Sequence, residues 1–220
     1  YDAPHGERRV HKQPLPRIGG VAVFAAVATG LLAIALASAA GFEVLSDSFG
    51  FSFGVLFGGG IIFATGLIDD VRGLRPLTKL SAQIVAALIA YAYGFRLEGF
   101  TVGSVDLDLG WFALPITILW VVGVTNAFNL IDGLDGLASG VALVALATTM
   151  TVAITLGNYE VAVLCAALLG ALLGFIRYNF SPAQIFLGDS GSLFVGYMLA
   201  VLSMYGALSA SASILVIVPI

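Results

Sequence analysis

Long apolar runs, separated by short polar segments, occupy most of this chain and predict helices that cross a membrane. A spanning helix needs about 20 apolar residues, and in lipid only helices or closed barrels satisfy their own backbone hydrogen bonds. A barrel would show alternating strands of about ten residues, whereas these runs are unbroken. The apolar runs cover residues 19–40, 51–68, 79–93, 111–124, 137–156, 160–176 and 191–208, with a shorter run at 213–220.

The runs predict an all-α fold, a polytopic integral membrane helical bundle of about seven spans and a truncated eighth. We interpret residues 1–220 as a single transmembrane domain. The chain starts at Tyr1 rather than at a methionine, and its last apolar run is too short to cross a bilayer. We therefore expect it to be a fragment that lacks N-terminal and C-terminal spans.

Composition supports this interpretation. The chain is 60% hydrophobic and 10% charged, and its mean hydropathy is +1.05. A soluble domain is about 45–50% apolar and about 25% charged, and a soluble fold of this size could not bury so much apolar surface. Cys165 is the single cysteine, which excludes a disulfide framework and a cysteine metal cluster. No basic face is evident, so nucleic acid is not an expected partner.

Basic residues gather on one side of the predicted bundle. Counting spans places every lysine and arginine except Arg96 on the same side. Cytoplasmic loops carry the excess of Lys and Arg, so this side is expected to face the cytoplasm. The same counting places three polar segments there: Asp69-Asp70, residues 126–136 and residues 179–189. Because all three meet one membrane face, they can form a single site.

The first polar segment holds Asp69 and Asp70 at the end of an apolar run, followed by Arg75 and Lys79. Two carboxylates near lipid are costly unless they are solvated, paired or metal-bound. One interpretation is a helix end that is merely solvated. The other is a magnesium–phosphate centre, because Mg²⁺ prefers oxygen ligands and is usually held by one or two carboxylates plus substrate phosphates. Arg75 and Lys79 would then bind phosphate.

The second polar segment repeats an oxygen-bearing side chain every three residues, at Asn126, Asn129, Asp132 and Asp135. On a helix this spacing predicts a polar stripe at the end of a span. A plain turn between two spans would need fewer such groups. A calcium-binding EF-hand loop is rejected because the glutamate at its twelfth position is absent.

The third polar segment places Asp189 just before an apolar run. Its structural interpretation is an N-cap, a role that Ser190 could share. Its functional interpretation uses the same geometry, because the free amides of a helix N-terminus attract phosphate and an adjacent Asp can hold a metal ion. The basic, proline-rich segment 8–20 is interpreted as a positive-inside anchor, with contact to lipid headgroups or substrate phosphates as the alternative.

Together these segments resemble the polyprenyl-phosphate N-acetylhexosamine-1-phosphate transferases, the membrane type of glycosyltransferase family 4. The matching residues are Asp69-Asp70 with Gly73-Leu74 and Lys79, residues 126–140, residues 186–196 (FLGDSGSLFVG) and the opening residues 14–20. The glycan-initiating members, such as those of O-antigen and teichoic-acid synthesis, resemble the chain more than the peptidoglycan member does. A histidine- and arginine-rich loop of that family, expected to help bind the nucleotide sugar, is not present.

The resemblance implies a bundle of about ten or eleven spans in the bacterial inner membrane, with a cytoplasmic site that uses Mg²⁺ or Mn²⁺. It implies transfer of a sugar 1-phosphate from a UDP-sugar to undecaprenyl phosphate. By this analogy Asp69, Asp70 and Asp189 are catalytic, and Asn129 with Asp189 binds the metal. The substrate-binding residues would be Lys79, Arg75, Asn126, Asp132 and Asp135.

Three points are left open by the sequence. A covalent phospho-aspartate intermediate is an alternative to direct attack. An ion-coupled secondary transporter is the alternative function, since transporters also place carboxylates in membrane helices. Glycine-rich residues 51–66 would allow the close helix contacts of a homodimer.

Overall fold

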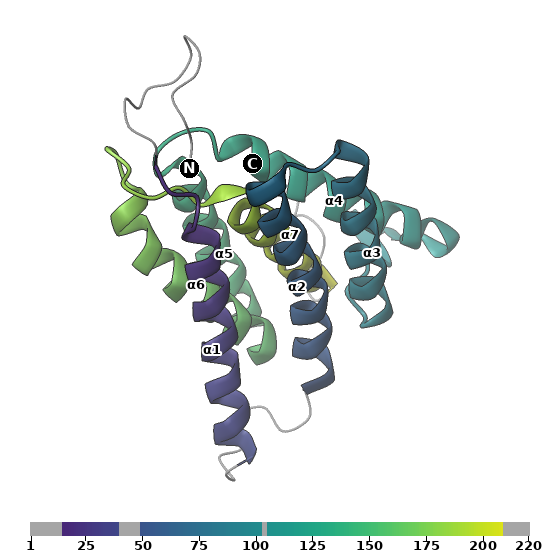
Figure 1. Ribbon diagram of the computed structural model, residues 1–220. Helices are drawn as coiled ribbons and strands as arrows, with labels where there is room; N and C mark the ends of the chain where they lie inside the picture. The colour runs from purple at the N-terminus through teal and green to yellow at the C-terminus, as the bar shows by residue number, and fades with distance from the viewer. Residues whose placement is uncertain (1–14, 40–48, 103–104, 209–220) are drawn as a thin grey trace.

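The computed structural model describes residues 15–39, 49–102 and 105–208. In this part of the chain seven α-helices form a bundle, so the predicted all-α membrane fold is confirmed (Figure 1). Between the third and fourth helices lie a short antiparallel hairpin and a 3-10 turn, neither of which was predicted. The elements are α1 (Gly19–Ala39), α2 (Phe49–Arg72), α3 (Pro76–Ala92), β1 (Gly99–Val102), β2 (Val105–Asp108), η1 (Gly110–Phe112), α4 (Ala113–Ile131), α5 (Leu137–Thr155), α6 (Tyr159–Asn179) and α7 (Gly188–Leu208).

Several helices extend beyond the apolar runs that predicted them. α2 continues to Arg72 and α4 to Ile131, so both carry polar residues in their last turns. α7 starts at Gly188, which places Asp189 inside its first turn rather than before the helix. The predicted ends were wrong because an apolar run marks only the part of a helix suited to lipid, whereas backbone hydrogen bonds continue into the polar ends.

The predicted stripe on one helix face was also wrong in part. Asn126 and Asn129 lie on α4, but Asp132 is its C-cap residue and Asp135 lies beyond the helix end. Gly136, with φ of +72°, adopts the left-handed backbone that lets the chain turn into α5.

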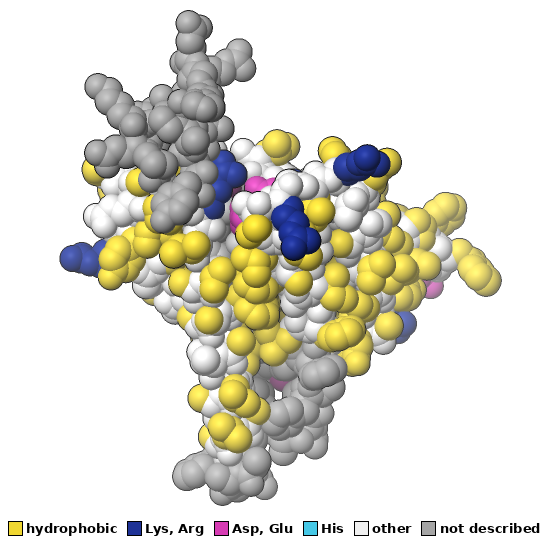
Figure 2. All heavy atoms as spheres, viewed as in Figure 1, with side chains coloured by type: hydrophobic (Ala, Val, Ile, Leu, Met, Phe, Trp, Pro, Cys, Tyr) yellow, Lys and Arg dark blue, Asp and Glu magenta, His cyan; other side chains and the backbone are white. Residues whose placement is uncertain are grey.

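Five helical stretches in the described part of the chain are long and apolar enough to cross a membrane. They are Gly19–Ala37, Gly54–Arg72, Gly110–Ile131, Leu137–Thr155 and Tyr159–Asn179, and α3 is a shorter apolar helix. Large apolar side chains such as Leu36, Leu119 and Val144 are mostly exposed, as lipid-facing residues would be. Figure 2 shows a largely hydrophobic flank below a group of basic and acidic side chains.

Helix α7 is the centre of the bundle and packs against α1, α2, α4, α5 and α6. Nearly all of its described side chains are buried, as a helix that is apolar on every face requires. Glycines bring its backbone against its neighbours. A β-carbon on Gly20 would clash with the Gly191 nitrogen, and one on Gly66 would clash with the Asp189 carbonyl oxygen.

The alternating direction of the helices brings the predicted polar segments to the same end of the bundle. The ends of α2, α4 and α6 meet the beginnings of α3, α5 and α7 there (Figure 1). Hydrogen bonds join these ends, including those from Lys79 to Asp189 and from Gly136 to Asn179. The predicted convergence is confirmed.

Candidate active site

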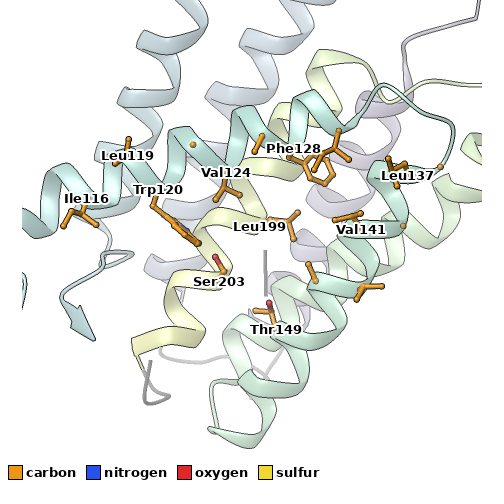
Figure 3. A pocket seen from close by; sticks show the side chains of 17 residues that line it. Ile116, Leu119, Trp120, Val124, Phe128, Leu137, Val141, Thr149, Leu199 and Ser203 are labelled. Atoms are coloured by element: carbon orange, nitrogen blue, oxygen red, sulfur yellow. The ribbon is translucent and has the colours of Figure 1, made fainter. Parts of the chain in front are cut away.

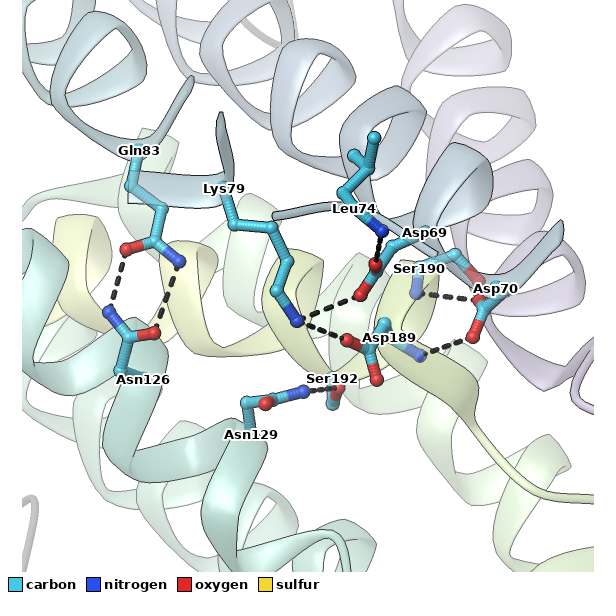
Figure 4. Close-up of polar contacts among 10 residues, drawn as sticks. All are labelled: Asp69, Asp70, Leu74, Lys79, Gln83, Asn126, Asn129, Asp189, Ser190 and Ser192. Atoms are coloured by element: carbon cyan, nitrogen blue, oxygen red, sulfur yellow. Dashed lines mark hydrogen bonds and ion pairs between the residues drawn. The ribbon is translucent and has the colours of Figure 1, made fainter. Parts of the chain in front are cut away.

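Lys79 lies at the centre of the polar end, between two carboxylates from different helices. Its Nζ is 2.8 Å from Asp69 Oδ2 and 2.8 Å from Asp189 Oδ2 (Figure 4). The lysine comes from the first turn of α3, whereas the aspartates come from the end of α2 and the start of α7. All three side chains are partly exposed, so ligands can reach the group. Three residues named from the sequence therefore form one cluster.

Asp69 and Asp70 are adjacent but contact different groups. Besides Lys79, Asp69 accepts a hydrogen bond from the backbone amide of Leu74, which closes the turn after α2. Asp70 accepts hydrogen bonds from the amides of Asp189 and Ser190, each at 2.9 Å. Successive residues on a helix point about 100° apart, which separates the two carboxylates.

Asn129 approaches the cluster from α4. Its Nδ2 donates to Ser192 Oγ at 2.7 Å, and Ser192 follows Asp189 by almost one turn of α7 (Figure 4). Within the described residues, no hydrogen bond occupies the amide oxygen of Asn129. That oxygen remains available to a cation or a ligand donor.

Asp132 contributes negative charge beside this group. Burial, together with the charges of Asp189 and Asp70, raises the pKa of its carboxyl to about 7, against the opposing effect of Arg17. No hydrogen bond within the described residues supports this carboxylate. A half-buried carboxylate without a hydrogen-bond donor favours a bound cation or a proton.

Asn126 pairs with a residue that was not singled out from the sequence. Its side chain exchanges hydrogen bonds with Gln83, Nδ2 donating to Gln83 Oε1 at 2.6 Å and Oδ1 accepting from Gln83 Nε2 at 3.3 Å. The amide pair joins α4 to α3 (Figure 4). Gln83 is buried and was missed from the sequence, although a polar residue four positions after Lys79 in an apolar helix was a usable signal.

Asp135 and Asn179 hold the two loops beside the cluster. Asp135 Oδ2 accepts the Ala183 amide at 3.0 Å. Asn179, buried at the end of α6, accepts from the Gly136 amide and from Ser139 Oγ, and it donates to the Ile185 carbonyl. Asn179 lay in the third predicted segment but had no assigned role. These bonds tie the α4–α5 loop to the α6–α7 loop.

The N-terminal segment pairs with the chain that leads into α7. Phe186 donates to the Pro16 carbonyl at 3.0 Å, and the Gly20 amide donates to the Leu187 carbonyl at 2.8 Å. This places Arg17 close enough to influence Asp132. Arg8, Arg9 and Lys12 lie outside the described residues. Arg75 is exposed at the N-cap of α3, and its side chain makes no ion pair within the described ranges.

The donors at this end fit Mg²⁺ only in part. No group of three or more His, Cys, Asp or Glu residues suited to a metal occurs among the described residues. Magnesium, however, is usually bound by one or two carboxylates together with substrate phosphates and water. Asp189, Asn129 and the unsupported carboxylate of Asp132 supply oxygens of this kind. The donor chemistry therefore suits a magnesium ion that arrives with a phosphorylated substrate.

An apolar pocket of about 800 Å³ lies next to the polar cluster, between α4, α5 and α7. Its lining includes Trp120, Phe128, Val141, Leu199 and Ser203 (Figure 3). The pocket reaches the polar end at Phe128, which adjoins Asn129 in the chain. An apolar ligand with a polar head could thus contact both regions.

Comparison with known proteins decides the family. The family model described as "Glycosyl transferase family 4" matches residues 52–207 of the chain. This range includes Asp69, Lys79, Asn129 and Asp189. The chain belongs to glycosyl transferase family 4. This confirms the family predicted from the sequence motifs.

Relatives in glycosyl transferase family 4 include a probable undecaprenyl-phosphate N-acetylglucosaminyl 1-phosphate transferase of Bacillus subtilis, 36% identical over 97% of this chain and 57% of the relative. A decaprenyl-phosphate N-acetylglucosaminephosphotransferase of Mycolicibacterium smegmatis is 39% identical over 91% of this chain and 52% of the relative. A phospho-N-acetylmuramoyl-pentapeptide-transferase of Limosilactobacillus fermentum is 44% identical over 60% of this chain and 41% of the relative. The chain thus spans about half the length of these curated relatives.

Proposed function

We propose that the protein transfers an N-acetylhexosamine 1-phosphate from a UDP-sugar to undecaprenyl phosphate. The products are the undecaprenyl diphosphosugar and UMP. The observation that carries the proposal is the Asp69–Lys79–Asp189 cluster in a chain of this family. The names of the Bacillus and Mycolicibacterium relatives include a polyprenyl phosphate and N-acetylglucosamine, which supports both halves of the proposed reaction.

In the proposed reaction a phosphate oxygen of the acceptor attacks the β-phosphorus of the donor, and the bond from that phosphorus to the UMP oxygen breaks. Protein groups act in phosphoryl transfer mainly by positioning and by stabilising charge. Lys79 pairs with phosphate oxygens, and exposed Arg75 attracts the substrates at longer range. Asp69 orients the acceptor phosphate or takes its remaining proton, and it needs little basicity because the second pKa of a phosphate monoester is near 6.

Asp189 and Asn129 are the proposed holders of Mg²⁺, with Asp132 beside them. The bound ion would neutralise charge on the diphosphate. Asn126 and Asp135 already form hydrogen bonds with other residues of the fold. Their proposed role is therefore to shape the part of the polar end that binds the uridine diphosphate.

The apolar pocket suits the polyprenyl chain of the acceptor. It is lined in part by α4 and α5, which are long and apolar enough to cross a membrane, and its lining is mainly apolar. With the polyprenyl chain in this pocket, the acceptor phosphate would lie at the polar end near Phe128. The amphiphilic shape of a polyprenyl phosphate matches this juxtaposition.

The proposed location is the bacterial inner membrane, with the polar end facing the cytoplasm, where nucleotide sugars are made. N-acetylglucosamine is the favoured sugar type, since the two relatives named for it align over 97% and 91% of this chain, against 60% for the muramoyl-pentapeptide relative. A homodimer stays a prediction. The comparisons lend no support to the transporter alternative.

The test is a transfer assay on the full-length protein in membranes, with a panel of UDP-sugars and with polyprenyl phosphates of short and full length. UMP release should require both the lipid phosphate and Mg²⁺. Asp189→Asn and Asp69→Asn should each lower kcat by about 100-fold or more, the size seen when a charge-stabilising group is removed. Asp108→Asn, an exposed change on the hairpin, is the matched control. Normal transfer by Asp189→Asn would remove the proposed metal site.

A further inference from the structure

Asp70 contacts backbone rather than the side chains of the cluster. Its Oδ1 accepts the amide of Asp189 and its Oδ2 accepts the amide of Ser190, both at 2.9 Å (Figure 4). The acceptor comes from the last turns of α2 and the donors from the first turn of α7. Both carboxylate oxygens of Asp70 accept backbone amides, whereas Asp69 accepts one backbone amide, from Leu74, and the ammonium group of Lys79.

The first turn of α7 needs an external acceptor. The first amides of a helix have no partner within the helix, and a side-chain oxygen from the preceding residue commonly supplies one. Here the preceding residue is Leu187, whose side chain carries no acceptor. Asp70 fills this role from another helix, and its negative charge also suits the positive end of the α7 dipole.

The contact between α2 and α7 leaves little freedom for this turn. A β-carbon on Gly188 would lie 2.8 Å from Asp70 Oδ2 and 3.0 Å from the Arg17 carbonyl. One on Gly66, a turn before Asp70 on α2, would lie 2.6 Å from Ser190 Cα. The glycines let the α7 backbone rest directly on α2, with Asp70 capping it.

The turn that Asp70 holds also carries the reactive groups. Asp189 Oδ2 lies 2.8 Å from Lys79 Nζ, and Ser192 receives the Asn129 amide one turn later. A shift of the first turn would therefore move the Asp189 carboxylate relative to Lys79 and Asn129. In active sites, displacements of about 1 Å can lower rates by about 100-fold.

We propose that Asp70 is a positioning residue that caps α7 and acts on the reaction only through the placement of Asp189. The catalytic half of this inference rests on the proposed function, whereas the capping half stands by itself. The two aspartates of the adjacent pair thus divide their tasks: Asp69 faces the substrates and Asp70 holds the helix that completes the site.

The capping half is tested by hydrogen exchange resolved to single amides, on the full-length protein in nanodiscs without substrates. In Asp70→Ala the amides of Asp189 and Ser190 should exchange at least about fivefold faster than in the wild type, as expected for a lost cap. Asp69→Ala, the adjacent control, should leave these two amides unchanged. Unchanged exchange in Asp70→Ala overturns the inference. If Asp70→Ala does not fold, Asp70→Asn keeps one acceptor oxygen, and one of the two amides should exchange faster.

The catalytic half is tested by comparing Asp70→Asn, Asp70→Ser and Asp70→Ala in the transfer assay. Asn and Ser can cap a helix but cannot take up a proton as a carboxylate does. They should retain at least about ten times the kcat of the alanine variant, with a pH–rate profile of wild-type shape. The inference is overturned if all three variants are equally inactive while the amides of Asp189 and Ser190 exchange rapidly in the alanine variant alone. That result would assign Asp70 a direct role in the reaction. If the wild type is inactive, the proposed function is refuted, and the exchange experiment still tests whether Asp70 caps α7.

Discussion

The environment of the Asp132 carboxyl indicates what kind of ligand the polar end can bind. Burial and the neighbouring charges of Asp189 and Asp70 raise the pKa of its carboxyl to about 7, from an ordinary value of 3.8. The charged form is therefore unfavourable in the folded protein unless a cation or a donor is present. Such a residue favours ligand binding at the expense of stability, which is common at functional sites.

This argument predicts a pH-dependent stability. Between about pH 4 and pH 7 the folded protein holds a proton on Asp132 that the unfolded chain releases, so the free energy of unfolding should fall as pH rises. Asp132→Asn should remove this part of the slope and melt higher than the wild type at pH 8, while losing transfer activity. The measurement is the melting temperature in nanodiscs with EDTA from pH 5 to pH 8. Asp108→Asn serves as the control, and equal slopes in wild type and Asp132→Asn would contradict the prediction.

At the scale of the elements, the site depends on how closely α1 and α2 approach α7. These approaches use glycine, because any side chain would meet the backbone of the partner helix. At the α1–α7 crossing, a β-carbon on Gly20 would lie 2.5 Å from Gly191 Cα and 2.6 Å from Ser190 Oγ. Small residues at such crossings are the usual means of tight packing in lipid.

Gly20→Ala is therefore expected to destabilise the bundle by about 1–3 kcal/mol, the usual range for overpacking. Gly30→Ala is the matched control on the same helix, because a β-carbon there would meet nothing within 4 Å. The control should be neutral or slightly stabilising, since alanine favours helix over glycine by about 1 kcal/mol. Thermal unfolding in nanodiscs measures both, and equal melting temperatures would show that α1 can move away from α7 without loss.

At the scale of the whole molecule, the direction of the helices decides whether one site exists. The α4–α5 and α6–α7 loops are joined by the Asp135 and Asn179 hydrogen bonds, whereas the α5–α6 turn is at the opposite end of both helices (Figure 1). The exposed positions Leu134 and Phe180 therefore belong to the polar end, and exposed Tyr159 belongs to the other end.

Cysteine labelling in intact bacterial cells tests this arrangement. Leu134→Cys and Phe180→Cys should resist a membrane-impermeant maleimide until the cells are opened, whereas Tyr159→Cys should react from outside. The native Cys165 is buried and gives a low background. Reaction of Leu134→Cys and Tyr159→Cys from the same side would refute both the orientation and the single cytoplasmic site.

The sequence alone predicted the helical bundle, the common end of the polar residues and the family. Unbroken apolar runs can be stable only as lipid-facing or buried helices, so the helical bundle followed from hydropathy. The alternation of spans then required Asp69, Asn129 and Asp189 to share one end. The motifs around them identified the family, which the match over residues 52–207 confirmed.

Only the tertiary structure decided what each polar residue contacts. Asp69 and Asp70 are identical in type and adjacent in the chain, yet one faces Lys79 and the other caps α7. Asn126 pairs with Gln83, and Asp132 and Asp135 lie beyond the helix whose stripe they were expected to join. Hydropathy reports how deeply a segment prefers to lie in lipid, but a hydrogen-bond partner depends on the rotation and separation of packed helices. Those are set by contacts between residues far apart in the chain, such as Gly66 with Asp189 and Gly20 with Gly191.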